Sequence, residues 1–249
     1  MPTRRDLLLG ALLAAPAYLL LATARRVHAL PDPAVRRWLD RQQDLALALS
    51  RGEVRPAQWQ SEIEALARSM DVPQLMAEIA RSDVRIAKGG TPNDPIKHTV
   101  AFRDEAGARR RLRFGAALFT FHRGDVITPH AHRHMVSAHL VVEGAFRVRN
   151  FDRLRDEASA IVVRPSGDRV IEVGAISTMS AERDNVHWFV PRTERAITFD
   201  VVISDLDAGA PSHVIEAIDP MRGQKQVDGT IRAPVVSFDE AARIYTSDV

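Results

Sequence analysis

The sequence predicts an all-β domain preceded by a small α-helical segment. From residue 98 to residue 203, short runs rich in β-branched and aromatic residues alternate with turn residues, which is typical of a β-sandwich or barrel. Residues 31–83 instead carry apolar side chains at helical spacing. A cluster of breaker residues from Lys88 to Pro95 separates the two patterns. We therefore divide the chain into a leader (1–29), a helical segment (30–90), a barrel (91–205) and a C-terminal extension (206–249).

The leader resembles an export signal rather than part of the folded domain. Arg4 and Arg5 precede an apolar run that reaches Ala24, which is the pattern of a twin-arginine signal. Small residues at 22–24 and at 27–29 offer cleavage sites. The run is about 18 residues long, near the lower limit for spanning a bilayer, so an uncleaved anchor is the alternative. We expect a periplasmic protein, either released or held at the membrane by this leader alone.

Apolar stripes predict two or three short helices after the leader. They run from Val35 to Leu49, from Trp59 to Met70 and from Val72 to Ile79. Asp71, followed by Val72 and Pro73, has the pattern of a helix start, with a capping side chain and a proline in the first turn. Ser237 is expected to cap one more helix near the C-terminus.

Eight runs of β-forming residues predict the strands of the barrel. They are residues 98–102, 116–121, 137–142, 146–149, 160–163, 170–173, 186–190 and 197–203. Turns are expected between them, among others at Glu143-Gly144 and from Pro165 to Asp168. After about Leu206 the regular spacing of strands and turns is lost.

The composition excludes several classes of function. The formal net charge of the 249 residues is only +2, so no strong positive field favours nucleic acid. The chain has no cysteine, which excludes disulfides, thiolate zinc sites and a cysteine nucleophile. Any metal ion must therefore be held by histidine, carboxylate or backbone oxygen.

Histidines gather in one short stretch, and their spacing predicts a metal site. His130, His132, His134 and His139 lie close together, and His187 follows on another predicted strand. One residue separates His130 from His132, so on a β-strand both rings point to one face. Three or four neutral imidazoles without a thiolate suit Fe(II), Mn, Ni, Cu or Zn. We expect His134 to lie outside the ligand set.

This arrangement resembles the cupin superfamily. The first cupin motif reads Gly-x5-His-x-His-x3–4-Glu-x6-Gly, and it is matched here by Gly124, His130, His132 and Gly144. His187 matches the histidine of the second motif. The resemblance implies a double-stranded β-helix, which is a jelly-roll barrel, with these three histidines as metal ligands. By analogy with cupins, a homodimer is also expected.

One position departs from the cupin motif, because Ser137 stands where the motif has glutamate. Either the site keeps three histidines, or His139, two residues further on the same face, replaces the carboxylate. A ligand set without the glutamate resembles that of the thiol dioxygenases, whose iron is held by three histidines. The local likeness is to the cysteamine dioxygenase and plant cysteine oxidase group, over roughly residues 115–203.

The likeness to that group rests on two stretches. Residues 129–135 with Gly144 match the first, and residues 185–189 with Thr193, Ala196 and Asp200-Val201 match the second. The Pro-Pro-Tyr of that group is absent, since the chain continues Val202-Ile203-Ser204.

The resemblance implies a non-haem Fe(II) oxygenase that oxidises a small thiol to a sulfinate with O2. Asp200 would then orient the substrate amine or hydrogen-bond close to the metal ligands, and its alternative is a charge at a strand end. Arg147 and Arg149 are weaker candidates for pairing with a substrate carboxylate. Two other functions stay open: a non-oxidative metallo-cupin, such as an isomerase or hydrolase with four histidines, and a periplasmic protein that binds a metal or small ligand without turnover.

Overall fold

The computed structural model describes residues 33–87, 93–207, 209–210 and 213–246. By its internal contacts the chain divides into residues 1–30 and residues 31–249, and every described residue belongs to the second unit. The predicted leader lies outside the described residues. Each helix in the described part of the chain is too short or too polar to span a lipid bilayer.

The predicted helices are confirmed. They are α2 (Pro33–Ser50), α3 (Pro56–Ala67), α4 (Val72–Arg81) and, near the C-terminus, α5 (Phe238–Ile244). The side chain of Asp71 caps α4 by accepting a hydrogen bond from the N–H of Gln74. Ser237 caps α5 in the same way, through the N–H of Glu240.

The strands among the described residues form two antiparallel sheets of a double-stranded β-helix. The first has six strands in the order β1-β2-β3-β10-β5-β8, and the second has seven in the order β11-β4-β9-β6-β7-β13-β12. The strands of the first sheet are β1 (Asp83–Ile86), β2 (Ile96–Ala101), β3 (Gly115–His122), β5 (Val136–Glu143), β8 (Ile176–Met179) and β10 (Arg195–Ile203). Those of the second are β4 (Ile127–Arg133), β6 (Ala145–Asp156), β7 (Ala160–Glu172), β9 (Val186–Pro191), β11 (Val214–Ala217), β12 (Gln224–Lys225) and β13 (Ile231–Pro234).

The sheets also use segments outside residues 91–205. β1 pairs with β2, β11 pairs with β4, and β13 pairs with β7. Each of these added strands has only four residues. Such a short strand carries too little alternation of polar and apolar residues to be recognised from the sequence. The C-terminal segment therefore contributes strands to the second sheet.

The turn predicted from Pro165 to Asp168 is wrong, because these residues lie inside β7. The pairing of β6 with β7 changes register there: Asn150 is opposite Gly167, and Phe151 is opposite Pro165. Ser166, which lies between Pro165 and Gly167, is therefore the extra residue of a β-bulge. Proline and glycine are tolerated in a strand at a bulge, where the ladder of hydrogen bonds is interrupted. The residues that indicate a turn in the sequence thus produce a bulge here.

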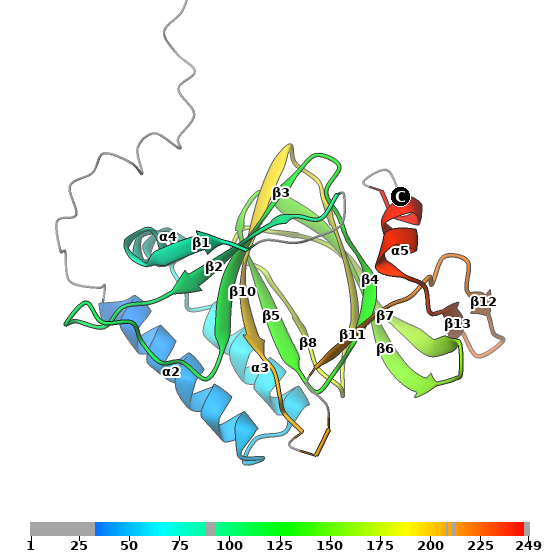
Figure 1. The fold of residues 1–249 in the computed structure, drawn as a ribbon, viewed down its shortest axis with the longest axis horizontal. Coiled ribbons are helices and arrows are strands. Elements are labelled where there is room, and N and C mark those ends of the chain that lie inside the picture. The colour runs from blue at the N-terminus through cyan, green and yellow to red at the C-terminus, as the bar shows by residue number, and fades with distance from the viewer. Residues whose placement is uncertain (1–32, 88–92, 208, 211–212, 247–249) are drawn as a thin grey trace, which may run out of the picture. The chain divides into compact units, whose positions relative to one another are not determined.

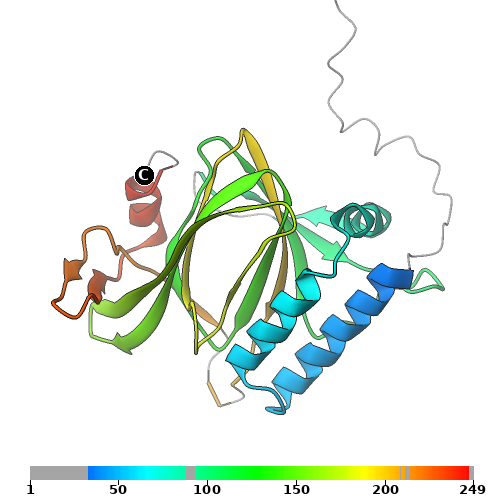
Figure 2. The same cartoon turned by 180° about the vertical axis from the view of Figure 1, so that it is seen from behind.

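Hydrophobic side chains pack on both faces of the first sheet: against the helices on its outer face, and against the second sheet on its inner face. Outward side chains of β5 and β10 pack with α2 and α3 in one cluster, which includes Trp38, Ile63 and Phe199. The inner faces of the two sheets meet in a second cluster, to which the first sheet contributes Phe121 and the second contributes Phe189. Figures 1 and 2 show α2 and α3 on one side of the barrel and α5 on the other. The inner face is thus enclosed by both sheets.

We expect the Gly144→Ala variant to lose about 3 kcal/mol of unfolding free energy. Gly144 connects β5 to β6 with a φ of +72°. A Cβ atom there would also lie 2.6 Å from the carbonyl oxygen of Arg195. Gly174→Ala is the matched control: its φ is +88° but nothing lies within 4 Å of the added Cβ, so we expect about 1 kcal/mol. Urea unfolding measures both variants, and equal losses would contradict the clash at Gly144.

Candidate metal centre

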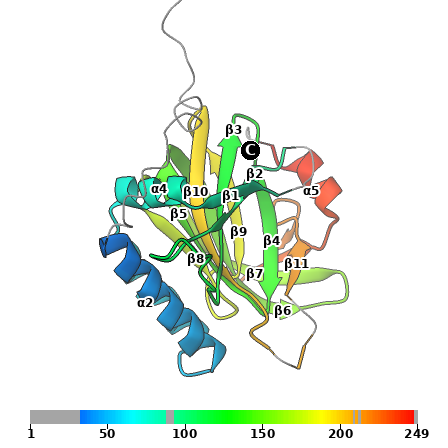
Figure 3. The ribbon, with the colours of Figure 1, turned by 60° about the vertical axis from the view of Figure 1, so that its left-hand side comes forward.

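Two neighbouring strands of the second sheet bring three histidines to the inner face of the barrel. β4 carries His130 and His132, and β9 carries His187 directly opposite His130. β4 has one residue more than β9 between Ile127 and His130, where the register shifts. This bulge places both Ile127 and His130 on the inner face, and Pro129 is accommodated within it. Figure 3 shows β4 and β9 side by side.

The ring nitrogens of these histidines converge. The Nε2 atom of His187 lies 3.1 Å from Nε2 of His130 and 3.3 Å from Nε2 of His132. One nitrogen of each ring lies within 4.8 Å of the other two. His132 and His187 are only 4% and 2% exposed, and His130 is half-buried. We call His130, His132 and His187 the three-histidine cluster.

The environment keeps the rings neutral. Burial lowers the pKa of His130 to about 4. Burial, reinforced by the neighbouring imidazoles, holds the pKa values of His132 and His187 well below their usual range. Nδ1 of His130 lies 2.7 Å from the carbonyl oxygen of Thr128, which can only accept, so Nδ1 carries the proton. Nε2 of His130 therefore presents a lone pair to the cluster.

The three-histidine cluster fits a divalent transition metal. Nitrogen ligands about 2.1 Å from an ion lie about 3.0 Å apart at right angles and about 3.4 Å apart in a tetrahedron. The two Nε2–Nε2 distances of His187, 3.1 Å and 3.3 Å, fall within this interval. Three neutral imidazoles without a thiolate form a donor set that such metals accept. The arrangement can therefore bind a metal ion and leave part of its coordination sphere open.

A second hydrogen-bonded group lies beside the cluster. His139 on β5 is directly opposite Asp200 on β10. Its Nδ1 lies 2.7 Å from Oδ2 of Asp200, and its Nε2 lies 2.8 Å from Oγ of Ser137. All three side chains are buried, and the ring of His139 lies 4.7 Å, centroid to centroid, from that of His187. We call Ser137, His139 and Asp200 the Ser–His–Asp chain.

The structure thus separates the predicted site residues into two groups. It brings His130, His132 and His187 together, whereas both ring nitrogens of His139 contact Ser137 and Asp200. Ligation by His139 and a catalytic role of Asp200 stay predictions. His134 lies between β4 and β5, with its Nδ1 3.7 Å from a carboxylate oxygen of Asp207.

The two arginines considered for a substrate carboxylate already have partners. Arg147 donates two hydrogen bonds of 2.8 Å to Asp168. Arg149 lies 3.5 Å from the same carboxylate and stacks over the ring of Trp188 at 3.8 Å. Both alternate along β6 with the inward residues Phe146 and Val148, so they lie on the outer face of the second sheet.

One buried asparagine holds the strand that carries His132, and a second lies opposite His187; the sequence predicted neither role. Asn185 binds the main chain of His132 twice: its Oδ1 accepts from the N–H at 3.2 Å and its Nδ2 donates to the carbonyl at 3.0 Å. Asn150 is directly opposite His187. The signal for Asn150 is its place in β6, since it is a polar residue that follows Phe146 and Val148 at alternate positions.

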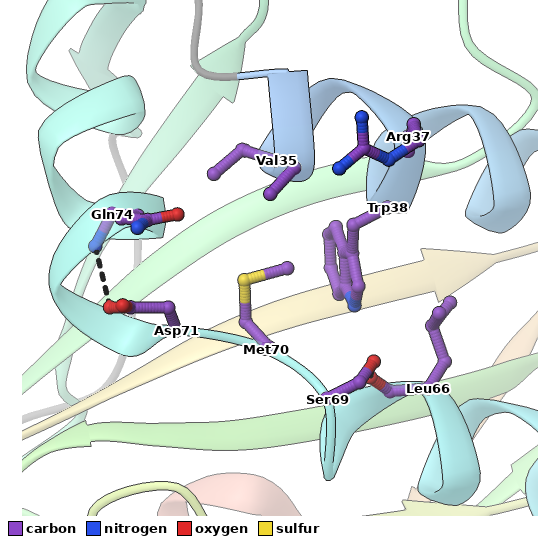
Figure 4. Close-up of a pocket in the computed structure, with 9 residues that line it drawn as sticks. Val35, Arg37, Trp38, Leu66, Ser69, Met70, Asp71 and Gln74 are labelled. Carbon is purple, nitrogen blue, oxygen red and sulfur yellow. Dashed lines mark hydrogen bonds between the residues drawn. The ribbon is translucent and has the colours of Figure 1, made fainter.

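A separate cavity of about 280 Å³ lies among the helices (Figure 4). Val35 and Trp38 of α2, Met70, and Asp71 and Gln74 at the start of α4 line it. Figure 4 shows Asp71 hydrogen-bonded to Gln74, which is the helix cap described above. The cavity thus lies on the helical side and is lined by none of the histidines.

Comparisons with solved structures find only low similarity. The chain is similar to a sugar phosphate isomerase of the cupin superfamily from Silicibacter pomeroyi DSS-3, with 18% identity over 64% of this chain and 90% of that chain and a TM-score of 0.37. It is similar to KdgF from Halomonas sp., with 19% identity over 48% and 84% of the two chains and a TM-score of 0.33. It is also similar to an oxalate oxidase in complex with glycolate, with 17% identity over 52% of this chain and 59% of that chain and a TM-score of 0.35.

Comparisons at the level of sequence add no relative: no protein-family model and no curated protein matches the chain. The fold therefore rests on the two antiparallel sheets and their strand order. The chain is a double-stranded β-helix with an N-terminal helical segment and a three-histidine cluster.

Proposed function

We propose that this protein is a metal-dependent oxygenase that binds Fe(II) at the three-histidine cluster and oxidises a small thiol to a sulfinate with O2. The observation that carries the proposal is the convergence of three neutral imidazoles without a carboxylate. Ser137, at the position of the cupin glutamate, hydrogen-bonds to His139 instead. The proposed ligand set therefore keeps the full charge of the ion, which favours binding of an anionic thiolate.

The proposed reaction is balanced without another reactant. A thiol and O2 give one sulfinic acid; the sulfur loses four electrons, O2 gains them, and the thiol proton ends on a sulfinate oxygen. When bound, iron would supply the redox chemistry and would lower the pKa of the thiol. The protein's own contribution is to exclude water and to orient the rings, through the carbonyl of Thr128 for His130 and through Asn185 for the strand that carries His132.

The Ser–His–Asp chain has a positioning role in this proposal. Asp200 holds His139, and the ring of His139 packs against that of His187. Oδ1 of Asp200 is buried and has no hydrogen-bond partner, which leaves one acceptor available for a group inside the barrel. The leader, with Arg4 and Arg5, supports the further proposal that the reaction takes place in the periplasm.

The proposal predicts that the iron-loaded protein consumes one O2 for each thiol oxidised. Protein purified without oxygen is loaded with Fe(II), its metal content is measured, and O2 uptake is followed with cysteine, cysteamine and 3-mercaptopropionate. Mass spectrometry should show thiol products that have gained two oxygen atoms. An iron-loaded protein that consumes no O2 with any of the three thiols would sink the proposal.

An Asp200→Asn variant tests the positioning role in the same assay. Asparagine keeps the shape of the side chain, so we expect unchanged iron content and a turnover number about 10- to 100-fold lower, with a smaller change in KM. A variant that loses its iron in proportion to its activity would show that Asp200 acts on metal binding instead.

A further inference from the structure

The wall of the barrel beside His187 carries an arginine from β7. Asn150 on β6 is directly opposite His187 on one side and Gly167 of β7 on the other. Directly opposite residues point to the same face of a sheet, so Asn150 and His187 lie side by side on the inner face. Arg169 lies two residues after Gly167 and opposite the inward Val148, which places it on that same face.

The side chain of Arg169 turns back along the strand toward Asn150. Its Nη1 donates a 3.0 Å hydrogen bond to Oδ1 of the fully buried Asn150. The chain passes over Gly167, where a Cβ atom would lie 2.7 Å from Nη1. Glycine at this position therefore makes room for the guanidinium, which is held by Asn150, the residue directly opposite His187.

Arg169 differs from its neighbours in having an uncharged partner. Arg147 and Arg149 on the adjacent strand pair with Asp168, and Arg153 pairs with Asp156. Within the described ranges, no carboxylate oxygen lies within 4.0 Å of the guanidinium of Arg169. The sheet thus neutralises its outward arginines and leaves an inward one with its full charge.

Two further buried nitrogen atoms, on Asn150 and on His187, have no hydrogen-bond partner. Nδ2 of Asn150 and Nδ1 of His187 are buried, and neither makes a hydrogen bond. Buried donors are normally satisfied, so such groups in one place indicate a function. A guanidinium beside an amide N–H group matches the two oxygens of a carboxylate. Arg169 is itself exposed to solvent, which gives a ligand access to this corner.

We propose that Arg169, held by Asn150, binds a carboxylate group of the ligand beside the three-histidine cluster. The choice of substrate that follows rests on the proposed function: the substrates are small thiols that carry a carboxylate, such as 3-mercaptopropionate or cysteine. Cysteamine has the thiol but not the carboxylate and is a poor substrate.

The test compares the two kinds of thiol by binding, without turnover. The Zn(II)-loaded protein is titrated with 3-mercaptopropionate and with cysteamine in a calorimeter, in the absence of oxygen. We expect Arg169→Gln to weaken binding of 3-mercaptopropionate about 10- to 100-fold and to change binding of cysteamine less than about threefold. Arg147→Gln, which removes an outward arginine from the neighbouring strand, is the matched control and should change neither.

Each other outcome overturns the inference. Equal weakening of both thiols would mean that Arg169 only supports the wall, and unchanged binding of both would mean that no carboxylate binds there. If Arg169→Gln does not fold, Arg169→Lys decides: it keeps the charge but loses the planar pair of donors, so only 3-mercaptopropionate should bind more weakly. Neither titration involves O2, so failure of the proposed oxidation would leave this result intact.

Discussion

Replacing His187 with alanine is expected to weaken binding of Fe(II) or Zn(II) by more than about 100-fold. The variant removes the imidazole whose Nε2 lies 3.1 Å and 3.3 Å from those of His130 and His132. Loss of a residue that only orients a ligand typically weakens metal binding 10- to 100-fold, so loss of a ligand should exceed that range. Titration of the metal-free protein against a chelator of known affinity measures the change.

His134→Ala is the control for the His187→Ala variant. His134 belongs to the same histidine-rich stretch but lies between β4 and β5, with Asp207 as its neighbour. We therefore expect its replacement to leave metal affinity within about threefold of the unmodified protein. Equal losses in both variants, or none in His187→Ala, would contradict the assignment of the three-histidine cluster.

Replacing Phe199 with alanine is expected to lower the unfolding free energy by about 3–5 kcal/mol. Phe199 is only 1% exposed, and its ring lies 6.0 Å from that of Trp38 and 6.2 Å from that of Phe102, centroid to centroid. The cavity would thus open between α2 and the first sheet. Val170→Ala, at a residue that is 58% exposed on β7, is the control and should change stability by less than about 0.5 kcal/mol.

The same unfolding experiment tests whether the helices and the barrel unfold together. In a Trp188→Phe variant, which removes the tryptophan of β9, the fluorescence of Trp38 and Trp59 reports on the helices, and far-UV circular dichroism reports on the whole unit. Because helices and sheet share one core cluster, the two signals should change at the same denaturant concentration. A fluorescence transition at lower denaturant would show that the helical segment unfolds by itself.

Most of the longer elements were predictable from their periodicity, and the shortest strands were not. The stripe from Val35 to Leu49 appears as α2, and the run at 197–203 appears as β10. β8 and β11 have four residues each, and β12 has two. They exist because longer neighbours offer them hydrogen-bonding partners, which is a tertiary effect that no local pattern records.

The same reasoning explains which parts of the site were predictable. His130 and His132 share a face by strand geometry, and the recurrence of a histidine in another strand pointed to His187. The partners of His139 were not predictable, because Asp200 meets it only through the pairing of β5 with β10. The inward position of Arg169 was not predictable, because Pro165 and Gly167 indicated a turn, whereas the bulge keeps the strand continuous.

The position of the cluster has a consequence for the thermodynamic stability of the barrel. His132 and His187 are 55 residues apart in the chain, and their strands are hydrogen-bonded neighbours. An ion held by both would act as a cross-link across that loop, present only when β4 and β9 are paired. At a free concentration 100 times its dissociation constant, it would add about 2.7 kcal/mol to the folded state. Chelation of that ion would then lower the unfolding free energy of the barrel by the same amount.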